Sequence, residues 1–241
     1  SDAITIRTAH TDITGYSFST VHKRNTMNFN KEQETAVSHK DGPMMVLAGP
    51  GSGKTTVITH RIMRLLEQGV SPSGILVITF TKAAAVEMKE RFLSLASGAA
   101  MKKEESGRVS FGTFHSVFYQ ILRLAYGLPA GSVIGEEEKR GFFKEFLAKS
   151  SLEVEDEGEF ISSVISEISH VKEERLDLRY YYSQNCPEEW FKKLYRGYEE
   201  MLHRTGKLDF DDMLVMCYDL FSKRKDILAA WQRKYRYILV D

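Results

Sequence analysis

One segment constrains the fold of this chain more than any other. The residues A-G-P-G-S-G-K-T, Ala48 to Thr55, follow the apolar run Met44 to Leu47 and precede a helical pattern. Glycines let the backbone wrap around a polyphosphate with its N–H groups turned inward, and the following helix directs its positive dipole end at the same anion. In such a loop Lys54 reaches the β- and γ-phosphates, and the Thr55 hydroxyl can ligate Mg²⁺. The segment therefore predicts a strand–loop–helix unit that binds a nucleotide.

The alternative is an ordinary glycine-rich turn between a strand and a helix, but such a turn would not need Lys54 and Thr55. The predicted nucleotide contacts in the loop are Ala48, Gly49, Pro50, Gly51, Ser52, Gly53, Lys54, Thr55 and Thr56.

Composition excludes several classes of protein. Of the 241 residues, 42% are hydrophobic and 27% are charged, which is typical of a globular chain. Its apolar runs are too short to span a bilayer, and no apolar segment near the N-terminus resembles a signal peptide. The two cysteines, Cys186 and Cys217, lack ligand or CxxC spacing. We therefore expect a cytoplasmic protein with no membrane partner.

Charge is unevenly distributed along the chain, although the net charge is zero. Residues 27–126 carry 12 basic and 8 acidic side chains, whereas residues 127–207 carry 12 basic and 17 acidic ones. The chain as a whole lacks the basic excess of a protein that binds nucleic acid in bulk. Any contact with nucleic acid must therefore use specific loops of the first segment.

Strand and helix patterns alternate from residue 27 to residue 126. Such alternation predicts a parallel sheet with helices on both faces. The pattern predicts helices over 30–37, 54–68, 82–95 and 115–125 and strands over 44–47, 75–80 and 109–112.

Strand patterns disappear between residues 127 and 207, where apolar residues follow three helical stripes. We expect an all-helical insertion there, with aromatic residues that pack rather than bind ligands.

The chain then returns with a helix near Asp209 and an apolar strand that ends at Asp241. Residues 27–126 and 208–241 would form one α/β domain that carries this insertion. Residues 1–26 have no assigned role and could be a leader, a tail or a short added strand, since Ile4 and Ile6 alternate with polar residues.

Several segments in order, from Phe29 to Asp241, resemble the first motor domain of UvrD/Rep-type superfamily 1 DNA helicases. The segment N-F-N-K-E-Q-E-T-A-V resembles the adenine-reading motif of that family, which would place Gln33 on the adenine. A local interpretation is that Asn30 and Gln33 form a helix-capping pair, as their spacing of three allows. Both interpretations can hold together.

Two further segments are similar to single-stranded DNA contacts of this family. In I-T-F-T-K-A-A-A-V-E-M-K-E-R, the resemblance assigns base stacking to Phe80 and DNA contacts to Thr81 and Lys82. The family pattern has Asn and then Lys after this Thr, where this chain has Lys82 and Ala83. Phe80 could instead be a core residue of its strand, and Thr81 is expected to cap the next helix. In F-G-T-F-H-S, the resemblance assigns phosphate contacts to Thr113, His115 and Ser116. Thr113 or Ser116 could instead simply cap a helix.

The final segment I-L-V-D resembles the start of the family's Asp-Glu motif, which would make Asp241 a ligand of Mg²⁺ together with Thr55. An alternative is an ordinary strand that ends in Asp. The segment L-D-F-D-D-M-L also matches the family, and Asp209 and Asp212 have helix-capping spacing.

The resemblance implies a RecA-like P-loop fold with a helical insertion, and an ATP-dependent 3′-to-5′ DNA helicase or translocase. Its cofactors would be ATP and Mg²⁺, and its partners ATP or ADP, single-stranded DNA and a second motor domain of the same protein. Lys54, Thr55 and Asp241 would act in catalysis. The glutamate and arginines that complete the family's site lie outside this chain, so we expect it to bind nucleotide without turnover. The rival hypotheses are a P-loop phosphotransferase and a non-catalytic module that binds nucleotide or single strands.

Overall fold

The computed structural model describes residues 2–8, 29–39, 41–49 and 51–241, with the backbone alone for residues 2–8. The strands are β1 (Asp2–Thr8), β2 (Met44–Ala48), β3 (Ile75–Thr79), β4 (Ser110–Thr113) and β5 (Tyr237–Val240). The helices are α1 (Lys31–Ser38), α2 (Lys54–Glu67), the 3₁₀ turn η1 (Pro72–Gly74), α3 (Lys82–Gly98), α4 (Lys103–Ser106), α5 (Phe114–Tyr126), α6 (Glu136–Ala148), α7 (Glu157–Glu173), α8 (Glu188–Thr205), α9 (Phe210–Lys223) and α10 (Lys225–Lys234).

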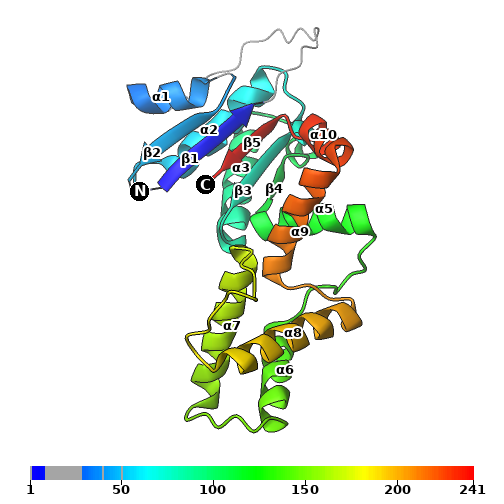
Figure 1. Ribbon diagram of the computed structural model, residues 1–241. Helices are drawn as coiled ribbons and strands as arrows, with labels where there is room; N and C mark the ends of the chain where they lie inside the picture. Colours follow the sequence, from blue (N-terminus) through cyan, green and yellow to red (C-terminus); the bar gives the residue numbers. More distant parts are fainter. Residues whose placement is uncertain (1, 9–28, 40, 50) are drawn as a thin grey trace. The chain divides into compact units, whose positions relative to one another are not determined.

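The five strands form one mixed sheet in the order β2-β1-β5-β3-β4 (Figure 1). Strand β3 pairs in parallel with β4 and with β5, which confirms the predicted parallel sheet for these three strands. Strand β1 is antiparallel to both β2 and β5, so β2 runs in the same direction as β5. Residues 2–8 thus form an added strand, one of the alternatives for the N-terminal segment, while residues 9–28 lie outside the described part of the chain.

An apolar core joins α2 and α3 to one face of the sheet, behind the strands in Figure 1. Strand β3 is buried along its whole length, on both of its faces, as expected of a strand covered on both sides. The buried members of this core are Ile58, Ile62, Met63, Leu65, Ile75, Val77, Met88, Phe92, Ala96, Val109 and Leu239. Among them, the residues from α2 lie on the apolar stripe that the sequence predicts.

Backbone contacts divide the chain into two compact units: Ser1–Val117 with Lys225–Asp241, and Phe118–Arg224. The second unit has its own apolar core, built from residues between Ile134 and Leu202. This core contains the aromatic residues Phe143, Phe191 and Tyr198, which pack as the sequence analysis expects. The domain boundaries predicted at residues 126/127 and 207/208 stay a prediction.

The predicted helices and strands of residues 29–126 all occur, with ends that differ by three residues or fewer. Helix α9 begins after Asp209, as predicted, and β5 ends at Val240, one residue before the predicted end of that strand. None of the helices in the described ranges is long and apolar enough to cross a membrane.

Candidate nucleotide and DNA-binding site

The predicted site residues follow the carboxyl ends of four strands. Strands β3, β4 and β5 are parallel, and β2 runs in the same direction as β5. The segments that begin at Ala48, Phe80, Thr113 and Asp241 therefore all lie along one edge of the sheet. In open α/β sheets this edge is where ligands bind.

The phosphate loop has the backbone conformation that its glycines predict. Gly51 and Gly53 have φ angles of +73° and +84°, in the left-handed region that a side chain disfavours. Gly53 is also the N-cap of α2, so the helix begins directly from the loop. The Lys54 ammonium lies 3.4 Å from the Ala48 carbonyl oxygen and 3.5 Å from that of Gly49. Pro50 lies outside the described residues.

Gln33 connects helix α1 to the phosphate loop. Its side-chain oxygen accepts a hydrogen bond from the Asn30 N–H (3.1 Å), and the Asn30 side chain accepts one from the Gln33 N–H (2.8 Å). This confirms the predicted capping pair. The Gln33 Nε2 also donates to the Ser52 carbonyl oxygen across 2.9 Å. The same amide is therefore a cap and a contact to the loop, and its assignment to adenine stays a prediction.

A second contact fixes α1 against α2. The fully buried Arg61 of α2 donates from its Nη1 to the Val37 carbonyl oxygen near the end of α1 (3.2 Å). Burial lowers the pKa of Arg61 below its usual value. Residues Ala36, Val37 and Val57 form a small apolar cluster at the same junction. Helix α1 is thus held at both ends, which fixes the position of Gln33.

A hollow of about 250 Å³ lies over the phosphate loop. It is lined by Gly51, Ser52, Gly53, Lys54, Thr55, Thr56 and Arg91. Arg91 comes from α3, and its Nη2 lies 2.5 Å from Glu87 Oε1, one helical turn earlier. The sequence analysis quoted Arg91 within the segment of Phe80 but assigned it no role. Nothing local in the sequence shows that this face of α3 meets the loop.

A neighbouring hollow of about 250 Å³ opens between α1 and β2. Its lining includes Asn30, Gln33, Ser52 and Lys54, together with apolar groups of β2. The two hollows share Ser52 and Lys54. The predicted phosphate contacts and the predicted adenine contact therefore line adjoining spaces.

Asp241 follows the buried strand β5. Its backbone N–H donates to the Ile78 carbonyl oxygen across 2.9 Å, which extends the β3–β5 pairing beyond Val240. The residue is therefore fixed at the carboxyl edge of the sheet. Strand β1 lies between β5, which Asp241 follows, and β2, which the phosphate loop follows. Its metal role stays a prediction.

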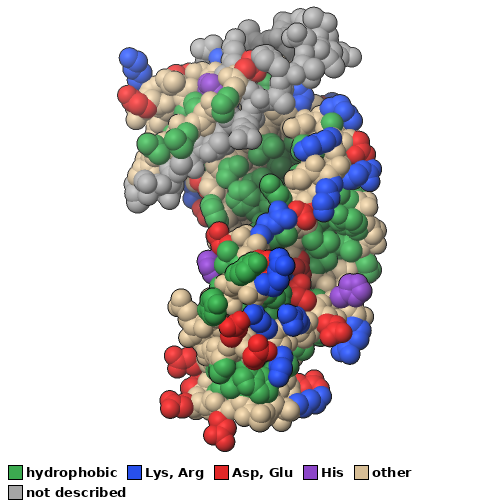
Figure 2. Space-filling view, viewed as in Figure 1, with side chains coloured by type: hydrophobic (Ala, Val, Ile, Leu, Met, Phe, Trp, Pro, Cys, Tyr) green, Lys and Arg blue, Asp and Glu red, His purple; other side chains and the backbone are tan. Residues whose placement is uncertain are grey.

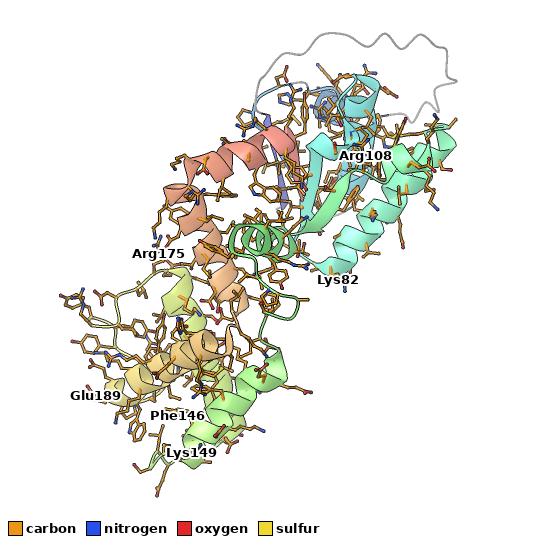
Figure 3. All side chains as sticks on the ribbon, turned by 90° about the vertical axis from the view of Figure 1, so that its right-hand side faces the viewer. Lys82, Arg108, Phe146, Lys149, Arg175 and Glu189 are labelled. Atoms are coloured by element: carbon orange, nitrogen blue, oxygen red, sulfur yellow. The ribbon has the colours of Figure 1, made fainter. Side chains whose placement is uncertain are left out.

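Phe80 lies on the surface immediately after β3. It is 78% exposed, so the alternative that Phe80 is a core strand residue is wrong. Its ring meets Phe114 edge-on, with centroids 5.7 Å apart, which supports the ring from one side. Thr81 caps α3 by accepting a hydrogen bond from the Ala84 N–H (3.1 Å), as predicted. Lys82 is exposed at the start of this helix (Figure 3).

The turn from β4 into α5 is closed by two side chains that cap each other. Thr113 N–H donates to Ser116 Oγ (2.8 Å), and Ser116 N–H donates to Thr113 Oγ1 (3.2 Å). The capping interpretation of this pair is thus confirmed. A Cβ on Gly112 would lie 2.6 Å from Ser116 Oγ, so the Ser116 hydroxyl keeps its capping position only with glycine at 112, a dependence that spacing in the sequence does not reveal. His115 is partly buried beside the pair.

The chain matches a known family over most of its length. The model of the UvrD/REP helicase N-terminal domain matches residues 29–241. The ATP-dependent DNA helicase PcrA of Leuconostoc citreum is 34% identical over 224 residues, which is 90% of this chain and 29% of that relative. PcrA of Staphylococcus aureus (strain Mu50 / ATCC 700699) is 34% identical over 227 residues, 89% of this chain and 29% of the relative. The chain thus spans less than a third of the length of these relatives.

Proposed function

The chain belongs to the UvrD/REP helicase N-terminal domain family, and we propose that it is the ATP-binding part of an ATP-dependent DNA helicase. In the whole protein, ATP hydrolysis would drive movement along single-stranded DNA in the 3′-to-5′ direction. The observation that carries this proposal is the shared edge: the hollow over Ala48–Thr55 and the exposed Phe80 both lie at the carboxyl ends of the parallel strands. ATP would then bind to the loop after β2 and DNA to the segment after β3, at the same edge of one sheet.

The hollow over the loop suits a polyphosphate. Lys54 and Arg91 supply two cations, and the start of α2 supplies N–H groups and the positive end of a helix dipole. We propose that Lys54 neutralises the β- and γ-phosphates and that Arg91 contacts a phosphate from the α3 side. Arginine suits this role because its planar guanidinium can donate two hydrogen bonds to one phosphate.

Two oxygen donors at the carboxyl edge of the sheet are of the kind that binds Mg²⁺. Magnesium is usually bound by one or two protein oxygens, with phosphates and waters completing its coordination. The Thr55 hydroxyl lines the hollow, and Asp241 is held at the same edge by its bond to Ile78. We propose these two residues as its ligands. When bound, Mg²⁺ would neutralise charge on the phosphates.

The remaining site residues fit adenine and a nucleic-acid strand. Gln33 lines the hollow beside the loop. Its amide uses one oxygen lone pair for Asn30 and one N–H for Ser52, which leaves a second of each for a base. The exposed ring of Phe80 offers a stacking surface. Thr81, Lys82 and the Thr113–Ser116 turn, with His115, offer hydrogen-bond donors beside it.

The proposal extends to the rest of the protein. Its partners would be ATP or ADP, single-stranded DNA and a second motor domain, and a cytoplasmic location agrees with two unpaired cysteines. Nucleotide binding without turnover by this chain stays a prediction, which a phosphate-release assay would test. The phosphotransferase hypothesis lacks support, because the relatives above are named as DNA helicases.

Calorimetry of the 241-residue chain with Mg-ATP tests the nucleotide assignment. We expect Lys54→Ala to weaken ATP binding at least tenfold, because it removes the loop's own cation. The control is Lys89→Ala, an exposed lysine of α3 outside both hollows, which should bind ATP as the unchanged chain does. Equal affinity of the Lys54→Ala and Lys89→Ala proteins would exclude the proposed site.

A further inference from the structure

Helix α9, the last helix of the helical unit, buries Met213, Cys217 and Leu220 on its apolar side and meets α7 through polar side chains. The apolar core of the unit consists of residues between Ile134 and Leu202 and thus belongs to the segments before α9. Helix α9 (Phe210–Lys223) lies along α7 instead, where hydrogen bonds and ion pairs join the two. The α7 side supplies Ser169, Lys172 and, just past the helix end, Arg175. Ser169 and Lys172, three residues apart, lie on one side of α7, and Arg175 follows the helix end with a left-handed backbone (φ +54°). We call these contacts the α7–α9 seam.

Lys172 occupies the centre of the seam. Its ammonium lies 2.6 Å from Asp212 Oδ1 and 3.0 Å from Asp209 Oδ2. The Lys172 and Asp209 side chains are only 5% and 2% exposed. Glu199 of α8 lies 2.8 Å from the same ammonium. One buried cation therefore meets three carboxylates.

A second residue of α8 and one residue of α6 also contribute polar groups to this centre. Tyr198 of α8 donates its hydroxyl to Asp209 Oδ2 (3.1 Å), and Lys139 of α6 lies 4.0 Å from the same oxygen. Burial alone would lower the pKa of Lys172, but Asp209 and Asp212 outweigh it and raise that pKa above its usual value. Lys172 is thus charged at neutral pH, and its side chain and that of Asp209 are nearly sealed from water.

The two ends of the seam are also polar. Ser169 Oγ donates to Asp211 Oδ2 (2.7 Å), and Arg175 Nη2 lies 3.0 Å from Asp219 Oδ1. The Arg175 guanidinium also lies over the ring of Tyr218, 5.4 Å from its centroid. Figure 3 shows Arg175 where the end of α7 comes beside α9.

The chain that leads into α9 is tied down at the same place. Leu208 N–H donates to the Ser132 carbonyl oxygen (2.8 Å), and Ile134 N–H donates to the Leu208 carbonyl oxygen (3.0 Å). The segment that enters the helical core is therefore paired with the segment that leaves it. Asp209, the next residue, is both the N-cap of α9 and a partner of Lys172.

Charged and apolar interfaces separate in different ways. Buried ion pairs add little net stability, because desolvation offsets their attraction, but removing one partner leaves an unpaired buried charge. Such an interface is either fully paired or open and hydrated. We propose that the α7–α9 seam is a latch: it opens as one unit and frees α9 and residues 206–209 while the helical core stays folded.

Hydrogen exchange followed by mass spectrometry on the 241-residue chain tests this proposal. In Lys172→Met, we expect exchange in a peptide over 206–223 to accelerate at least tenfold, with a peptide over 191–202 in α8 unchanged. The matched control is Lys223→Met, which removes a 76% exposed lysine of α9 paired with Asp219 at 3.6 Å. That control should leave both peptides unchanged.

A second variant keeps the proposal testable if Lys172→Met does not fold, as judged by circular dichroism. Ser169→Ala/Arg175→Ala removes both ends of the seam and retains its centre, and should accelerate exchange over 206–223 at least threefold. Equal acceleration of 191–202 and 206–223 would show that the seam belongs to the core and would overturn the latch. Unchanged exchange over 206–223 in the variant that folds would overturn it as well.

Discussion

Gln33 donates its side-chain amide to the backbone carbonyl of Ser52, 2.9 Å away and 19 residues later in the chain. The same side chain closes the capping box of α1 with Asn30. The first helix of the family domain is therefore bonded directly to the phosphate loop. A Cβ on Gly53 would lie 3.2 Å from Gln33 Nε2, so the close approach also depends on that glycine.

The contact from Gln33 to Ser52 predicts that replacing Gln33 changes both the preference for adenine and the strength of ATP binding. In Gln33→Ala the loop loses one hydrogen bond, worth about 0.5–1.5 kcal/mol, and the amide proposed to face adenine. We expect the ratio of ATP to GTP affinity to approach one and ATP binding to weaken several-fold, measured by calorimetry. Glu34→Ala, an exposed change on the same helix, is the control. An unchanged ATP to GTP ratio in Gln33→Ala would remove Gln33 from the adenine site.

Phe80 and Phe92 offer a contrast between a surface ring and a core ring. Phe80 is 78% exposed and Phe92 is 0% exposed. We expect Phe80→Ala to weaken binding of single-stranded oligonucleotide by about 1–3 kcal/mol, with unchanged stability to urea. Phe92→Ala should instead cost about 3–5 kcal/mol of unfolding free energy. Fluorescence anisotropy and urea titration measure the two quantities.

The Phe80 prediction fails if DNA affinity per folded molecule is the same for Phe80→Ala as for the unchanged chain. The salt dependence gives a second check. Residues 27–126 carry 12 basic and 8 acidic side chains, whereas residues 127–207 carry 12 basic and 17 acidic ones, and Figure 2 shows both kinds interspersed over the helical unit. Binding at the Phe80 edge should therefore weaken as salt rises.

Local features of this fold could be predicted from the sequence. The glycine-rich loop, the strands that precede site residues and the caps at Asn30, Thr81 and Asp209 each depend on neighbours within a few positions. Spacing alone identifies such pairs. The core aromatic residues were also predictable, because helical periodicity marks the apolar face.

Contacts between distant segments were not predictable in the same way. Arg91 lines the phosphate hollow, and Lys172 pairs with Asp209 across 37 residues. Periodicity tells which face of a helix is apolar but not which helix lies opposite a charged residue. The position of β1 between β2 and β5 is likewise set by pairing partners about 40 or more residues away, which alternation of Ile4 and Ile6 cannot specify.

Gly112 and Ser116 should show strong coupling in a double-mutant cycle. An alanine at 112 would place its Cβ 2.6 Å from Ser116 Oγ, so the hydroxyl must leave its cap. We expect Gly112→Ala and Ser116→Ala each to cost about 1 kcal/mol of unfolding free energy, as for a lost cap. The double variant should cost about the same as either alone, because both changes remove one interaction. Additive costs in urea titrations would show that Gly112 acts by another route.

Asp212 predicts how the stability of the helical unit depends on pH. Burial and the neighbouring Asp209 carboxylate together raise the pKa of Asp212 to about 6, against the attraction of Lys172. The carboxyl therefore binds its proton more tightly in the folded state than in the unfolded chain. Its contribution to stability is fully present below the usual pKa of 3.8 and is lost as pH rises through about 6.

Asp209 contributes to the pH dependence of stability with the opposite sign, and in a lower pH range. Although burial acts to raise its pKa, Lys172 and the helix cap lower it below 3.8. Its contribution is present above that pH and is lost as pH falls further, so the range from 4 to 6 reports mainly on Asp212. Asp212→Asn keeps an acceptor for the Asp209 N–H, which Asp212 Oδ2 accepts at 3.1 Å, but cannot ionise.

We therefore expect the unfolding free energy of the unchanged chain to fall between pH 4 and pH 7 relative to that of Asp212→Asn. The difference should be on the order of 1–3 kcal/mol, from a shift of about two pKa units. Asp219→Asn, on the same helix but 32% exposed, is the control and should follow the unchanged chain. Urea titrations at each pH measure these values. Parallel curves for the unchanged chain and Asp212→Asn would show that Asp212 is already ionised without penalty at the centre of the seam.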